Sequence, residues 1–109
     1  MLERRERLKL EDGRELRLLS ALEVLEARRE AEGLARAPKE HALCSNACLL
    51  ARALETEEGS PIFSGGEAVL AGLRVGEIAA LAKIWSQFNR EENPALTMGQ
   101  EEAEALKKN

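Results

Sequence analysis

Three residues of types that bind metals lie close together near the middle of the chain. His41, Cys44 and Cys48 are spaced i, i+3 and i+7, so a helix would place them on one face. The chain contains no second His and no third Cys to complete a four-ligand zinc site. We therefore interpret the cysteines as small buried hydrophobic residues and His41 as a residue near a helix start. We expect no metal and no cofactor.

The same histidine is the one candidate general base for nucleophilic catalysis. The candidate nucleophiles are the serines at positions 20, 45, 60, 64 and 86. None of them lies in a Gly-x-Ser-x-Gly elbow, the strained turn that exposes a catalytic serine. Ser20 and Ser64 each precede a Glu by three residues, a spacing typical of a helix-capping box. The sequence thus predicts a protein that is not an enzyme and has no catalytic residue.

Two of the three aromatic side chains belong to the clearest amphipathic pattern in the chain. Its apolar residues recur at i, i+3, i+4, i+7 and i+10, namely Ile78, Leu81, Ala82, Trp85 and Phe88. Such a stripe can face the core, which has little other aromatic bulk, or form an apolar surface for a partner's helix or strand. If it is a surface, the candidate partner-binding residues are Leu81, Ile84, Trp85 and Phe88.

The amino-acid composition predicts that the elements carrying these residues are mostly helices. The chain has 18 Leu and 17 Ala in 109 residues, against only eight β-branched residues. This length allows one domain with one modest core. We expect a mainly α fold, a small bundle of about four short helices with an N-terminal β-hairpin, occupying residues 1–94.

The hairpin is predicted over about residues 6–19, where alternating leucines flank the Asp12-Gly13 turn signal. A continuous helix from Glu3 to Glu32 is the alternative, at a cost of roughly 1 kcal/mol for an internal glycine. The capping-box pattern Ser20 to Glu23 favours the hairpin, because a helix that starts at Ser20 leaves the preceding residues to form another element.

Helices are predicted over about residues 21–32, 39–57, 65–72 and 75–92. Gly33 is placed to end the first helix, and Pro38 suits the first turn of the second. Ser64 is the expected N-cap of the third, and Pro94 follows the fourth. Residues 95–109 are polar and are expected to form a weakly ordered tail.

Charge and hydropathy exclude several classes of partner. The formal net charge is −4, and acidic residues are interleaved with the basic ones of the N-terminal third, so nothing would hold the chain on nucleic acid. No apolar stretch approaches the roughly 20 residues that span a bilayer, and the start is charged rather than signal-like. Two cysteines with none elsewhere to pair fit reduced thiols. We expect a cytoplasmic protein with no nucleic acid and no membrane partner.

The segment from Asn46 to Leu70 resembles the core of bacteriophage tail assembly chaperones. It contains the end of an Ala/Leu-rich helix, the acidic turn around Gly59, the following Phe63 and the start of a short helix. In that family a last amphipathic helix follows, here Glu77 to Asn89. The resemblance covers about residues 20–93.

The resemblance implies a non-enzymatic factor, encoded by a phage or prophage, that works in the host cell cytoplasm. Such factors bind the tape measure protein, protect its hydrophobic segments from aggregation and help to recruit tail tube subunits. Several copies act on each client, which implies self-association into a homo-oligomer. The family supplies no catalytic residue, and its members commonly have a frameshifted, extended form that the tail after Pro94 would suit.

Two other interpretations remain open from the sequence. A small helical adaptor or regulatory module, unrelated to phage tails, would share nearly all of these features. A helix-turn-helix DNA-binding protein would use residues 64–73 and 75–88 as its two helices. Its recognition helix would carry only Lys83 and, at its end, Arg90, which are too few cations for that function.

Overall fold

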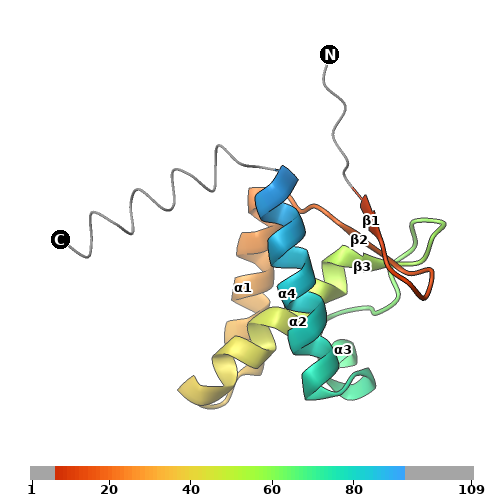
Figure 1. Ribbon diagram of the computed structural model, residues 1–109. Coiled ribbons are helices and arrows are strands. Elements are labelled where there is room, and N and C mark those ends of the chain that lie inside the picture. The colour runs from red at the N-terminus through yellow and green to blue at the C-terminus, as the bar shows by residue number, and fades with distance from the viewer. Residues whose placement is uncertain (1–6, 93–109) are drawn as a thin grey trace.

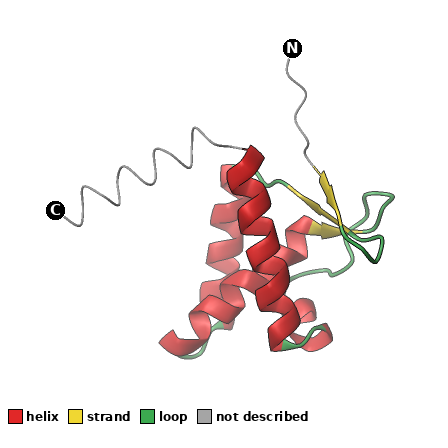
Figure 2. Ribbon diagram, viewed as in Figure 1, coloured by secondary structure: helices red, strands yellow, loops and turns green. Residues whose placement is uncertain are grey.

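The computed structural model describes residues 7–92 and shows a mainly helical protein with a small antiparallel sheet at one side (Figure 1, Figure 2). The elements follow in the order β1 (Arg7–Lys9), β2 (Glu15–Arg17), α1 (Ala21–Leu34), the 3-10 helix η1 (Pro38–Glu40), α2 (His41–Ala53), β3 (Leu54–Glu55), α3 (Gly66–Gly72) and α4 (Val75–Glu92). The predicted fold class is confirmed. The tail predicted over residues 95–109 lies outside the described residues.

The N-terminal hairpin is formed as predicted, and the continuous-helix alternative is wrong. β1 and β2 pair with Leu8 opposite Leu16, and the turn between them contains Gly13 at a φ of +95°, a conformation that favours glycine. The side chain of Asp12 accepts a hydrogen bond from the Arg14 amide. Because the strand alternates, Leu16 faces inward and is completely buried.

Helix α1 begins where the sequence predicts and ends two residues later than predicted. Both hydrogen bonds of the capping box are present, from the Glu23 amide to Ser20 Oγ and from the Ser20 amide to the Glu23 carboxylate. Gly33 does not end the helix, because it keeps a negative φ and the Ala35 amide still donates to the Ala31 carbonyl. The chain leaves the helix at Ala35 in an extended conformation.

The predicted second helix over residues 39–57 is wrong at both ends. Residues 38–40 form the 3-10 turn η1, α2 itself ends at Ala53, and Leu54 and Glu55 form a third strand beside β2. Pairing with a strand almost 40 residues away overrides the local helical preference, because it buries Leu54 completely and places Glu55 between two arginines. The acidic turn that follows has Gly59 at a φ of +88°.

The predicted serine cap of α3 is also wrong. Gly65 occupies the N-cap position without a side-chain cap, and the Gly66 amide donates instead to the Glu30 carboxylate of α1, at 2.8 Å. Gly66 packs so closely on α2 that an added Cβ would clash with Cys48 Sγ. The Glu30 carboxylate of α1 therefore accepts an amide hydrogen bond at the start of α3, a role that the local motif had assigned to Ser64.

Helix α2 forms the centre of the bundle, because α1, α3 and α4 all pack against it. The main core joins one face of α2 to the sheet and to α4, and its largest fully buried members include Leu16, Leu50, Leu54, Val69 and Ile78. A second, smaller cluster joins the other face of α2 to α1 through Ala27, Ala31, Cys44 and Cys48. The small side chains of this cluster let α1 and α2 approach closely.

Candidate partner-binding groove

The four predicted partner-binding residues all lie on α4, but they do not share one environment. Leu81, Trp85 and Phe88 are 7%, 6% and 1% exposed, so they belong to the inner face of the helix. Ile84 is 39% exposed on another side of α4. The structure therefore places three of the candidates inside the domain and one at its surface.

Trp85 is anchored by its indole nitrogen. Its Nε1–H donates to the Arg17 carbonyl at the end of β2, over 2.7 Å, and this bond joins α4 to the sheet. Trp85 also lines an open groove. Of the four predicted residues, Trp85 is the one that lines this groove.

The groove runs between α1 and α4, which lie antiparallel and both pack on α2 (Figure 1). We call it the α1–α4 groove, and it encloses about 540 Å³. Helix α1 contributes Ala21, Val24, Leu25, Ala27 and Arg28 to its lining. Helix α2 contributes Ser45 and Leu49, and α4 contributes Trp85, Ser86 and Asn89. The α1–α4 groove is thus lined mainly by apolar and small side chains.

The most exposed large apolar side chain in the groove is Leu25, at 45%. It lies on the same side of α1 as Ala21 and Arg28, at helical spacing. Among the described residues that line the groove, Arg28 alone carries a charge. Such a lining has no nucleophile paired with a base, and it suits the apolar face of a helix.

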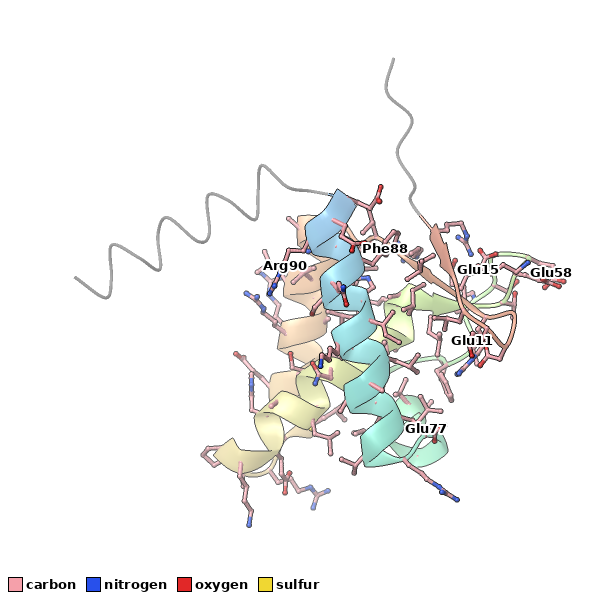
Figure 3. The ribbon with its side chains drawn as sticks, in the orientation of Figure 1. Glu11, Glu15, Glu58, Glu77, Phe88 and Arg90 are labelled. Carbon is pink, nitrogen blue, oxygen red and sulfur yellow. The ribbon has the colours of Figure 1, made fainter. Side chains whose placement is uncertain are left out.

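Figure 3 shows that the two sides of α4 carry different residues. Phe88 projects on the side of the sheet, whereas Arg90 projects on the side of α1. Arg90 lines a second hollow together with Lys83, and this hollow adjoins the groove because Ser86 borders both. The same hollow is also lined by Glu91, so the α4 side of the groove is flanked by charged side chains of both signs.

The metal-ligand hypothesis is not supported by the positions of its three residues. Cys44 and Cys48 are free and buried against α1, whereas His41 is exposed at the start of α2. Burial raises the pKa of the Cys48 thiol to about 12, which keeps it protonated and makes it a poor ligand. Across residues 7–92, no three side chains among His, Cys, Asp and Glu are arranged to hold a metal ion.

A half-buried carboxylate, that of Glu30, joins three helices and was missed by the sequence analysis. It accepts from Arg52 of α2, at 2.6 Å, and from the Gly66 amide of α3. Burial raises the pKa of this carboxyl, but the two hydrogen bonds outweigh it, so the pKa lies below its ordinary value. No local motif marks this role, because the two partners of Glu30 lie 22 and 36 residues away from it in the sequence.

A second network surrounds Glu55, which is only 7% exposed. Its two carboxylate oxygens lie 2.7 Å from Arg7 Nη1 and 3.1 Å from Arg17 Nε. Arg17 also binds Glu23 of the α1 capping box, and this ion pair lowers the pKa of Glu23 to about 2. The network ties all three strands to the start of α1, beside the groove.

The sequence analysis missed the α1 wall of the groove, although Ala21, Leu25 and Arg28 show helical spacing. The hydrophobic pattern of α1 is weak, and a leucine on a weakly amphipathic helix cannot be assigned to core or surface without its neighbours. Comparison of the chain with family models, curated proteins and solved structures found no match. None of the described helices combines the length and apolar character needed to cross a membrane.

Proposed function

We propose that this protein is a phage or prophage tail assembly chaperone that binds an apolar helix of the tape measure protein in the α1–α4 groove. The observation that carries the proposal is the groove itself, which is lined mainly by apolar side chains, with the exposed Leu25 on one wall and the buried Trp85 bordering the other. The resemblance of residues 46–70 to that family supports the identity of the client.

The shape of the groove suits a third helix beside α1 and α4. Packed helices lie about 8–10 Å apart, and small side chains along the contact allow this approach. Ala21 and Ser86 supply such small side chains on opposite walls. A client helix with apolar residues at i, i+3, i+4 and i+7 would cover Leu25 and Leu49, which are otherwise in contact with solvent.

The charge of the chain suits a protein that keeps an apolar client in solution. The formal net charge of −4 opposes association of the complexes with one another. Arg28 on the α1 wall favours a client helix with an acidic residue beside its apolar stripe. Several copies would act along one long client, each covering one segment, and a client covered in this way would be presented to the tail tube subunits.

The experiment is co-expression with the longest helical protein encoded nearby, followed by pull-down and light scattering. We expect a soluble complex with several copies of this chain, and a client that aggregates when expressed alone. Leu25→Glu should abolish recovery of the complex, because it puts a charge in the groove. Leu22→Glu is the matched control, since Leu22 is 59% exposed on the same helix and does not line the groove.

Two outcomes would count against the proposal. A client that is equally soluble and unbound without this chain would reject the chaperone function and leave the alternative, a helical adaptor whose partner is unrelated to phage tails. Equal loss of the complex in Leu22→Glu and Leu25→Glu would reject the groove as the binding site.

A further inference from the structure

The turn of the N-terminal hairpin contains an Asp-Gly pair, in which a backbone amide can react with the side chain that precedes it. In an open chain the Gly13 nitrogen can attack Cγ of Asp12, because glycine has no side chain to block the approach. The new C–N bond closes a succinimide ring, and the carboxyl OH and the amide hydrogen leave as water. When water reopens the ring at the main-chain carbonyl, the C–N bond of the original peptide breaks and the product is isoaspartate.

The folded hairpin holds both reacting groups in other hydrogen bonds. The Gly13 amide, which would be the nucleophile, donates to the Leu10 carbonyl over 3.1 Å. Asp12 Oδ1 accepts from the Arg14 amide at 3.0 Å, so the carboxylate is fixed on the backbone two residues further on. The Leu10 amide donates in turn to the Arg14 carbonyl, over 2.8 Å, and closes the loop around the pair. Attack on Cγ therefore requires the turn to open.

The Arg14 side chain binds the second carboxylate oxygen of Asp12. Its Nε and Nη2 lie 2.7 Å and 2.6 Å from Asp12 Oδ2, and we call these contacts the Arg14 clamp. Hydrogen bonds from this side chain, and next from the Arg14 amide, hold the pKa of Asp12 below its ordinary value. Ring closure proceeds from the protonated carboxyl, because a carboxylate has no adequate leaving group. The Arg14 clamp therefore opposes the reaction by its charge as well as by its geometry.

Isoaspartate at position 12 would displace the strands of the hairpin. The product routes the main chain through the former side chain, so the turn becomes longer by a methylene group. Turn length sets the register of a hairpin, and here that register places Leu8 opposite Leu16. Leu16 is completely buried, and the adjacent Arg17 carbonyl accepts from Trp85 of α4. Modification of the turn would therefore disturb both the core and the anchor of α4.

We propose that Asp12-Gly13 is a latent site of isoaspartate formation, which the closed turn and the Arg14 clamp keep unreactive in the folded protein. The chemistry needs only water, and Asp12 is exposed to solvent. The turn lies at the end of the hairpin that points away from the helices, close to Glu11 in Figure 3, so it can open without unfolding of the bundle. Isoaspartate accumulates in proportion to the time that the turn spends open. The reaction involves the hairpin alone and does not depend on the proposed function.

The test measures the rate of isoaspartate formation at position 12 in the full chain, in warm neutral buffer and in concentrated urea. Chromatography followed by mass spectrometry separates the two isomers of the peptide that contains this position. In the wild-type chain we expect a rate about tenfold lower in buffer than in urea, because only the open turn reacts. Arg14→Ala should raise the rate in buffer by about threefold, since it removes the side-chain hydrogen bonds to Asp12. It should leave the rate in urea unchanged, because the clamp exists only in the folded chain.

Lys9→Ala is the matched control within the same hairpin. Lys9 carries the same charge as Arg14, but its side chain is 68% exposed and its Nζ lies 4.0 Å from Glu57. Its removal should therefore leave the rates in buffer and in urea unchanged. Thermal unfolding checks that both variants keep the stability of the wild-type domain.

Three outcomes would overturn the proposal. Equal rates for the wild-type chain in buffer and in urea would show that the folded turn gives no protection. An unchanged rate for Arg14→Ala in buffer, or an equal rise with Lys9→Ala, would exclude the Arg14 clamp. A rise for Arg14→Ala that is as large in urea as in buffer would assign the effect to the local sequence rather than to the fold.

Discussion

The two sides of α4 show opposite uses of apolar and charged side chains. On the side of the sheet, Leu16 and Leu54 are completely buried, and the carboxylate of Glu55 is held by two arginines. On the side of α1, Leu25 is 45% exposed in an open groove, and Arg28 is the single charged side chain among the described residues that line it. Contiguous apolar surface left open to water usually marks a binding site. We therefore infer that the sheet side of α4 stabilises the fold, whereas the groove on the α1 side is the surface that a partner could contact.

The largest expected difference between the two sides of α4 comes from replacing one leucine on each side by alanine. Leu54→Ala removes a fully buried side chain that joins β3 to the core, and should lower the free energy of unfolding by about 3 kcal/mol. Leu25→Ala should lower it by less than about 0.5 kcal/mol. Urea denaturation followed by circular dichroism measures both. Equal losses would mean that the groove wall is part of the core.

The second prediction concerns the buried carboxylate of the sheet. Glu55→Gln leaves Arg7 and Arg17 without their shared negative partner, and should lower the free energy of unfolding by about 2 kcal/mol. Glu58→Gln is the control, because Glu58 is exposed in the turn that projects from the sheet (Figure 3). A Glu55→Gln protein as stable as the control would show that the network contributes nothing to the fold.

The third prediction concerns the acid stability of the α1 start. Because the pKa of Glu23 is lowered from 4.5 to about 2, its ion pair with Arg17 stabilises the fold above about pH 4.5 and is lost as the pH falls towards 2. Solvent screening limits this contribution to about 1 kcal/mol. In Glu23→Gln the loss of stability over this pH range should be smaller by that amount, while Gln can still serve the capping box. Acid titrations of stability that coincide for the two proteins would exclude this role.

The smallest effect is expected from the charge substitutions that test binding. Leu25→Glu and Leu22→Glu should each change the free energy of unfolding by less than about 0.5 kcal/mol, because both side chains are exposed. Thermal unfolding in the absence of any client checks this. A large destabilisation by Leu25→Glu alone would mean that its effect on binding reports a damaged fold.

The sequence predicts the elements that depend on local signals. The Asp12-Gly13 turn and the Ser20–Glu23 capping box need only neighbouring residues, and both are present. The end of α2 and the cap of α3 depend on Glu55 and Glu30, whose partners lie in distant parts of the chain. Local patterns cannot reveal these contacts, so both were predicted incorrectly.

The candidate site was predicted in part for the same reason. The stripe on α4 locates Trp85, but periodicity alone cannot distinguish a residue that faces the core from one that borders a groove. The groove arises because α1 and α4 both pack on α2 and leave space between them. This arrangement depends on helix packing, which a single sequence does not specify.

The most direct test of the central claim is site-specific photo-crosslinking in the complex with the co-expressed client. A photoreactive amino acid at position 25 lies in the groove, whereas one at position 22 is exposed on the same helix outside it. We predict a crosslink to the client from position 25 and none from position 22. Equal crosslinking from the two positions, or crosslinking from position 22 alone, would contradict the assignment of the α1–α4 groove as the binding site.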